Sequence, residues 1–178
     1  MAVSAVSTVW AVFVALDQLS ALNRTSRADF IRRFADDFFN EQARDLVTLL
    51  DNEALTFEDD ATFPYFVIDE EKVRRFGIAE KKRDELQARK RYSPYEVDDF
   101  LLGHLQDIGL FWTRGLVDMK DVCSYFYWYI HTTWKNPEIR KYVHSQGERE
   151  WRGAYRELER VAKELEIYVR RHKLLRNL

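Results

Sequence analysis

The best-defined helices that this sequence predicts lie in residues 93–137, SPYEVDDFLLGHLQDIGLFWTRGLVDMKDVCSYFYWYIHTTWKNP. The first helix begins with Ser93 at the cap position, followed by Pro94 and then by Glu96, which can bond back to the Ser93 amide. Asp118 is placed to cap the second helix, whose aromatic residues fall on every side. A helix that is apolar all round packs in the centre of a bundle or against a partner, so these residues predict a helical fold.

The rest of the chain also favours helix. Only six glycines and three prolines occur among 178 residues, so few turns interrupt the helical spacing of the apolar side chains. Residues 57–91 differ, because they combine Pro64, Gly77 and the β-prone run Tyr65 to Ile68, the one strand candidate. We therefore expect an all-α fold, a mainly antiparallel bundle of about five to six helices with a long N-terminal helix and a loop excursion at residues 57–91.

The first sixteen residues carry no charged side chain, although 33% of the chain is Asp, Glu, Lys or Arg. As a helix they would span about 24 Å, which is shorter than the roughly 30 Å of a bilayer core. Extending the helix would bring Asp17 toward the membrane, which is unfavourable. Arginines follow the segment while no lysine or arginine precedes it, a pattern that would keep the remainder of a membrane protein cytoplasmic.

Three interpretations of this apolar segment stay open: a membrane anchor, a helix in the protein's own core, and a helix shared with another copy. The chain accordingly divides into residues 1–23, an apolar N-terminal helix, and residues 24–178, a helical bundle domain. The residues expected to contact a membrane or a partner are Val3, Val6, Trp10, Phe13 and Leu16.

Charge is unevenly distributed along the chain. The net charge of -2 argues against a general nucleic-acid-binding protein. Residues 41–60 are nevertheless rich in acids, and residues 72–91 are rich in bases. Either these segments face each other or water, or the basic one contacts phosphates or anionic lipid.

No combination of residues predicts a catalytic, cofactor or metal site. Cys123 is the single cysteine, which excludes an internal disulfide and fits a reducing compartment, and its aromatic neighbours favour a buried, inert thiol. The most metal-like group, Asp98, Asp99, His104 and Asp107, does not share one helix face and is typical of a solvated surface. We therefore expect a protein that is not an enzyme and has no cofactor.

One segment has a pattern in common with known proteins. It runs from Asp107 to Val143 and contains Ile-Gly-Leu at residues 108–110, then Arg114 to Asp118, then the aromatic helix and Trp134 before a polar turn. This segment resembles a family of uncharacterised bacterial helical proteins grouped as a domain of unknown function. The resemblance implies an N-terminal transmembrane helix followed by a cytoplasmic helical domain, and it implies no catalytic or ligand-binding residues.

The sequence as a whole predicts a non-enzymatic helical interaction or scaffold protein, tethered as a single-pass protein to the cytoplasmic side of a bacterial inner membrane. The alternative is a soluble, cytoplasmic helical subunit of a larger or homo-oligomeric assembly that uses the N-terminal or the aromatic helix as its interface. We expect a protein partner or self-association, with the membrane as a further contact and no nucleic acid. The expected interface residues of the aromatic helix are Tyr125, Trp128 and Tyr129.

Overall fold

The structure is a computed structural model, and it describes residues 26, 29–36, 38–60, 63–149, 153 and 155–172. The chain divides into two compact units, residues 1–37 and residues 38–178. In the first unit, residues 29–36 are helical. The apolar helix predicted for residues 1–23 lies outside the described residues, together with its five expected contact residues, Val3, Val6, Trp10, Phe13 and Leu16.

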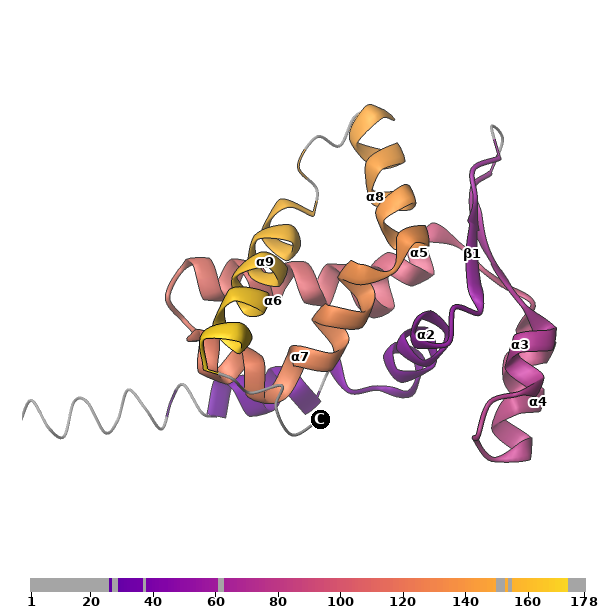
Figure 1. Ribbon diagram of the computed structural model, residues 1–178, viewed down its shortest axis with the longest axis horizontal. Helices are drawn as coiled ribbons and strands as arrows, with labels where there is room; N and C mark the ends of the chain where they lie inside the picture. Colours follow the sequence, from indigo (N-terminus) through magenta and orange to yellow (C-terminus); the bar gives the residue numbers. More distant parts are fainter. Residues whose placement is uncertain are drawn as a thin grey trace, which may run out of the picture. The chain divides into compact units, whose positions relative to one another are not determined.

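The second unit is mostly helical (Figure 1). Its longest described helix is the aromatic one, α7, which contacts α2, α6, α8 and α9. The helices are α2 (Glu41–Asp51), α3 (Glu70–Arg74), α4 (Glu80–Arg89), α5 (Pro94–Val97), the π-helical turn η1 (Asp98–Leu102), α6 (Gly103–Thr113), α7 (Met119–Lys135), α8 (Pro137–Arg149) and α9 (Arg156–Arg171).

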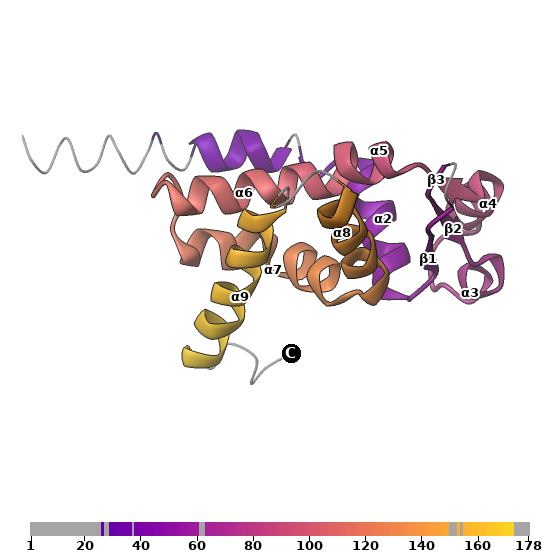
Figure 2. The same ribbon diagram turned by 90° about the horizontal axis from the view of Figure 1, so that it is seen from above.

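The mostly helical fold that was predicted is confirmed, and a small sheet is added to it. Strands β1 (Leu55–Glu58), β2 (Tyr65–Ile68) and β3 (Arg91–Tyr92) form an antiparallel sheet in that order. Leu55 pairs with Ile68, and Phe66 pairs with Tyr92. Figures 1 and 2 both show the sheet between α2 on one side and the pair α3 and α4 on the other.

The described residues of the excursion at residues 57–91 therefore include strands and the helices α3 and α4. The predicted strand candidate is confirmed as β2, but its neighbours β1, of four residues, and β3, of two, were missed. Strands this short are defined by their pairing partners, so local propensity does not identify them. The buried faces of Phe57 and Phe66 then meet the ring of Tyr142 on α8, with each pair of ring centroids 5.3 Å apart.

Two side chains of α8 satisfy the backbone of the edge strand β1. The Phe57 amide donates to the Glu138 carboxylate at 2.8 Å, and the Lys141 ammonium donates to the Phe57 carbonyl at 2.8 Å. Unpaired edge strands invite further strand pairing, so α8 protects this edge. It also ties the sheet to the helices.

Replacing Glu138 with alanine is expected to lower the free energy of unfolding by about 1 to 2 kcal/mol, because the amide of buried Phe57 loses its acceptor. Amide hydrogen exchange at Phe57 should become faster. Urea denaturation and hydrogen exchange measure the two effects. Glu138→Gln is the matched control, since its amide oxygen can still accept this bond; an equal loss in both variants would contradict the assignment.

The predicted helix starts are confirmed by their hydrogen bonds. Ser93 and Glu96 form a reciprocal capping box at α5, and Asp118 and Asp121 form another at α7. The Asn40 side chain accepts from the Ala43 amide at the start of α2. These caps were predictable because each one is made by residues within a single helical turn.

Helices α5 and α6 form one continuous rod that contains a π-helical turn. The Gly103 amide donates to the Asp98 carbonyl, one residue further back than in an α-helix. A Cβ at residue 103 would lie 3.0 Å from that carbonyl oxygen, so a glycine suits this tight place. Turns of this kind re-aim the side chains at their start and are frequent at functional sites.

The acid-rich and base-rich segments meet in the structure. The Lys82 ammonium on α4 lies 2.7 Å from the Glu41 carboxylate and 2.8 Å from the Asp45 carboxylate on α2. Lys72 donates to the Glu53 carbonyl at 2.8 Å. Part of the basic segment is therefore used for contacts inside the second unit.

The prediction of a single-pass membrane protein is corrected. Within the described ranges, every helix is either too short or too polar for a bilayer crossing. The apolar residues 1–16, from which the prediction was made, are outside those ranges.

Candidate functional site

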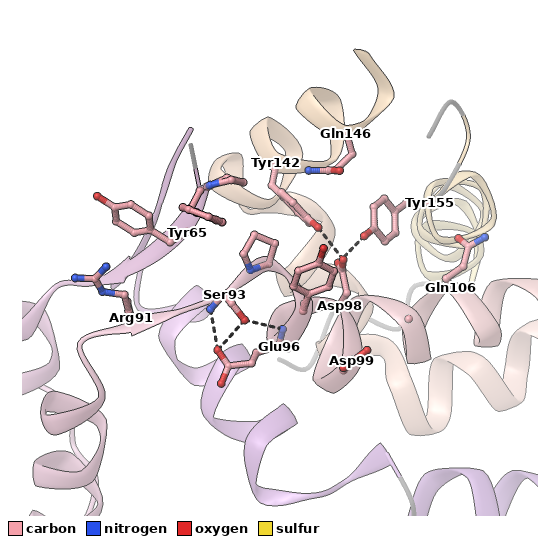
Figure 3. A pocket seen from close by; sticks show the side chains of 15 residues that line it. Tyr65, Arg91, Ser93, Glu96, Asp98, Asp99, Gln106, Tyr142, Gln146 and Tyr155 are labelled. Atoms are coloured by element: carbon pink, nitrogen blue, oxygen red, sulfur yellow. Dashed lines mark hydrogen bonds between the residues drawn. The ribbon is translucent and has the colours of Figure 1, made fainter. Parts of the chain in front are cut away.

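A cavity of about 1040 Å³ lies among β2, β3, the α5–η1–α6 rod, α8 and Tyr155 (Figure 3). The π-helical turn forms part of its wall, and Asp98 and Asp99 of that turn both line it. We call this cavity the Asp98 pocket. Its lining residues are Phe63, Pro64, Tyr65, Arg91, Ser93, Pro94, Tyr95, Glu96, Asp98, Asp99, Gly103, Gln106, Tyr142, Gln146 and Tyr155.

The Asp98 carboxylate is held by two tyrosine hydroxyls from different parts of the chain. Tyr142 on α8 donates to Oδ2 at 2.7 Å, and Tyr155 at the start of α9 donates to Oδ1 at 2.5 Å. Figure 3 shows both hydroxyls converging on the carboxylate. The side chain of Asp98 therefore has one fixed orientation in the wall of the pocket.

Burial sets the protonation behaviour of this group of residues. Loss of solvent raises the pKa of the Asp98 carboxyl, although the hydrogen bonds from Tyr155 and Tyr142 oppose that rise. Burial, strengthened by the Asp98 charge, raises the pKa of both tyrosine hydroxyls. The tyrosines are therefore neutral donors at physiological pH.

This rise in pKa predicts a pH-dependent effect of Asp98→Asn. Because the folded-state pKa is above the ordinary value of 3.8, the contribution of Asp98 to stability is complete below pH 3.8 and is lost as pH rises through the folded-state pKa. Relative to Asp98→Asn, the native protein should therefore become less stable as pH increases from 3.8. Urea denaturation of both proteins between about pH 3 and pH 8 measures this difference in the free energy of unfolding. The contributions of the titratable groups that both proteins share cancel in the difference. A difference that is independent of pH would contradict the raised pKa.

Aromatic side chains form the mouth of the pocket. Phe63 and Tyr95 are 76% and 80% exposed, which is unusual for large apolar side chains. The Arg91 guanidinium lies over the Tyr65 ring, 5.1 Å from its centroid, while the Tyr65 hydroxyl donates to Glu58 at 2.9 Å. The mouth therefore presents aromatic surface to solvent beside a polar interior.

The far wall of the pocket is anchored to α9. Gln106 accepts from the Leu158 amide at 2.9 Å, so a side chain of α6 caps the first turn of α9. Tyr155 at the N-cap makes no side-chain cap bond itself, which leaves its hydroxyl for Asp98. The position of Tyr155 thus depends on the contact between α6 and α9.

The acids of the pocket differ in their partners. Glu96 is bound by Arg89 and by the Ser93 amide. Asp98 is bound by tyrosines alone, and Asp99 is exposed; within the described part of the chain, neither forms an ion pair with a basic residue. The interior of the pocket therefore carries negative charge that the described residues do not balance.

The predicted interface residues of α7 divide between surface and core. Tyr125 and Trp128 are 51% and 41% exposed. Tyr129 is half-buried, and its ring packs edge-on against Phe38 at 4.9 Å and against Phe39 at 5.1 Å between centroids. Tyr125 and Trp128 are thus the two of the three that present substantial surface.

The weaker chemical candidates do not gather into a site. Burial raises the pKa of the Cys123 thiol, which makes it less reactive. Among the residues that the structure describes, no three His, Cys, Asp or Glu side chains are placed to hold a metal ion. Of the four residues of the metal-like group, Asp98 and Asp99 line the pocket, whereas the His104 ring packs against Phe38 at 5.6 Å.

Sequence reasoning missed the Asp98 pocket. Tyr142 and Tyr155 are 44 and 57 residues away from Asp98, so no local motif connects them. One signal was present: Asp98 lies four and seven residues before the buried Leu102 and Leu105, on the apolar stripe of its helix. A carboxylate in such a position needs hydrogen-bond partners, which is a reason to search for them.

Comparisons with models of protein families, with curated proteins and with solved structures found no match. The resemblance of Asp107–Val143 to a family of uncharacterised bacterial helical proteins therefore stays a prediction. The functional argument rests on the pocket itself.

Proposed function

We propose that this protein is a non-enzymatic interaction protein, a helical subunit of a larger assembly, and that it binds a segment of a partner protein in the Asp98 pocket. The observation that carries the proposal is the Asp98 carboxylate, fixed by Tyr142 and Tyr155 in the wall of a 1040 Å³ cavity. A few fixed polar groups among aromatic side chains are typical of specific binding sites.

The protonation states of Tyr142 and Tyr155 favour a binding role for these two side chains over a catalytic one. General acids and bases work best when their pKa lies near the ambient pH. The pKa of each tyrosine hydroxyl beside Asp98 is instead raised away from neutrality. Their role is then to orient Asp98, and the pocket holds its ligand without transferring a proton from them.

The shape of the site favours a chain segment over a compact small molecule. The volume of 1040 Å³ is at the upper end for small-ligand pockets, which are about 300 to 1,000 Å³. The exposed rings of Phe63 and Tyr95 continue the apolar surface beyond the interior. One residue of a partner can enter while its neighbours lie on these rings.

The helices behind the pocket support this role. Helix α9 packs on both α6 and α7, and the connection between α6 and α7 is short. We interpret these three helices as a small bundle, mainly antiparallel, that holds the pocket wall rigid. A rigid wall lowers the entropic cost of binding.

A second candidate interface is the exposed part of α7. Tyr125 and Trp128 present large aromatic surface, and such residues are enriched at protein interfaces. This surface would serve self-association or a second contact within the same assembly. The two candidates predict different contact positions.

Site-specific photo-crosslinking tests which surface binds. A photoreactive benzoyl-phenylalanine replaces Tyr95 at the pocket mouth in one variant, Trp128 on α7 in a second, and Lys81 on α4 as a control, all in the full chain within cells. We expect a discrete adduct from position 95 and none from position 81. An adduct from position 128 alone would overturn the pocket as the interface and favour α7.

A further inference from the structure

We infer that the group recognised by the Asp98 pocket is the guanidinium of an arginine side chain on the partner protein. This inference rests on the function proposed above and adds the chemistry of the ligand. It depends on three features of the pocket: its unbalanced negative charge, the fixed geometry of one carboxylate, and the aromatic rings around it.

The charge of the pocket requires a cation. Asp98 and the exposed Asp99 both line the pocket, and within the described ranges neither forms an ion pair with a basic side chain. The one basic residue of the lining, Arg91, lies over Tyr65. An anionic ligand would meet like charge, whereas a cationic ligand would compensate a carboxylate that has lost much of its solvent.

The geometry of Asp98 suits a planar cation with two parallel donors. Each carboxylate oxygen accepts one tyrosine hydrogen bond, which leaves each with a further lone pair. A guanidinium donates two parallel N–H groups to the two oxygens of one carboxylate. Because Tyr142 and Tyr155 already fix the carboxylate, little side-chain entropy is lost when the second pair of bonds forms.

The aromatic lining favours arginine over lysine. Tyr142 and Tyr155 flank the Asp98 carboxylate (Figure 3), and Tyr95 lines the same pocket. A guanidinium stacks on such rings and is weakly hydrated, while an ammonium is strongly hydrated and has no plane to stack. Entry of a lysine would therefore lose more hydration for fewer contacts.

The test is a titration of the full chain with three small probes, followed by two-dimensional amide NMR. The probes are the Nα-acetyl methylamides of arginine, of citrulline, which has the same shape without the charge, and of lysine. We expect the arginine probe to shift the amide signals of residues 95–106 and 142–146. The citrulline and lysine probes should bind about tenfold more weakly, since they lose a charge-assisted or bidentate contact.

Variants test which residues of the Asp98 pocket bind the arginine probe. Tyr95→Ala removes an exposed ring and leaves the core intact, and it should weaken arginine binding severalfold. Asp98→Asn should abolish the preference for arginine over citrulline. Asp84→Asn, which removes an exposed carboxylate on α4 outside the pocket, should leave the titration unchanged.

The outcomes separate this inference from the proposed function. If arginine and citrulline bind equally, or if no arginine-induced shift occurs in the pocket, arginine recognition is wrong. A crosslink from position 95 would still support the pocket as an interface in that case. Equal binding of lysine and arginine would reduce the inference to recognition of charge alone and would overturn the guanidinium. Loss of fold in Asp98→Asn would not affect these comparisons, because the native chain provides them.

Discussion

Replacing Gly109 with alanine is expected to lower the free energy of unfolding by about 2 to 3 kcal/mol, although alanine is the better helix former by about 1 kcal/mol. The Cβ of an alanine would lie 2.3 Å from the carbonyl oxygen of Glu157 and 2.5 Å from its carbonyl carbon. These are backbone atoms, so the first turn of α9 would have to move away from α6. Urea denaturation followed by tryptophan fluorescence measures the effect.

The first turn of α9 cannot move freely, which is why we expect a large loss. Gln106 of α6 binds the Leu158 amide, and Thr113 of α6 donates to the Glu157 carboxylate at 2.7 Å. Both bonds would lengthen if α9 shifted. Because Tyr155 begins the same turn, Gly109→Ala should also weaken ligand binding in the Asp98 pocket.

Gly77→Ala is the matched control for this prediction. No atom lies within 4 Å of a Cβ placed on Gly77, and its backbone is not in the left-handed region. We expect a change in stability of less than about 1 kcal/mol, with stabilisation through the unfolded chain as one source. Equal stability of Gly109→Ala and the native protein would show that α6 and α9 do not pack as closely as described.

Replacing Asn136 with alanine is expected to lower the free energy of unfolding by about 2 kcal/mol. Its side-chain oxygen accepts from the Glu138 amide at 2.9 Å and from the Ile139 amide at 3.3 Å, which caps α8. Its side-chain nitrogen donates to the Leu50 carbonyl at the end of α2, at 3.1 Å. Asn136 is only 6% exposed, so water does not readily replace these bonds.

Two further variants separate the contribution of the α8 cap to stability from that of the hydrogen bond to Leu50. Asn136→Asp keeps the acceptor for α8 but removes the donor to Leu50, so it should lose only part of the stability. Asn40→Ala removes the side-chain oxygen that accepts from the Ala43 amide at the start of α2, and we expect a loss of about 1 kcal/mol from it. If Asn136→Ala and Asn40→Ala cost the same in urea denaturation, the link between α2 and α8 contributes nothing. Since α8 carries Tyr142, the link also bears on the pocket.

The parts of the fold that the sequence predicts are those made by neighbouring residues. The caps at Ser93 and Asp118 depend on bonds within one turn, and both were predicted correctly. Strand β2 was found from its β-prone residues.

The parts that were missed depend on residues distant in the chain. Strand β1 was not predicted, because its pairing, for example of Leu55 with Ile68, defines it rather than local propensity. The π-helical turn at Asp98–Leu102 has no local sequence signal that we know of. The pocket depends on the π-helical turn, which presents Asp98, and on the sheet, in which β2 contributes Tyr65 and β3 contributes Arg91.

The prediction of a membrane-spanning helix was wrong. It weighed one apolar segment and the arginines after it, and the described helices offer no span to support it. The aromatic helix, in contrast, was predicted to pack in the centre of a bundle or against a partner. Helix α7 has both characters, because Phe126 is buried while Trp128, two residues later, is exposed.

The most direct test of the central claim is competition for the crosslink at position 95. Before irradiation, the arginine probe is added at rising concentration to the chain carrying the photoreactive group and to the partner that it crosslinks. The arginine probe should suppress formation of the adduct, and the citrulline probe at the same concentration should not. This result would place the partner in the Asp98 pocket through a guanidinium. An adduct that neither probe reduces would show that the partner reaches the mouth of the pocket without occupying it, and would contradict the account.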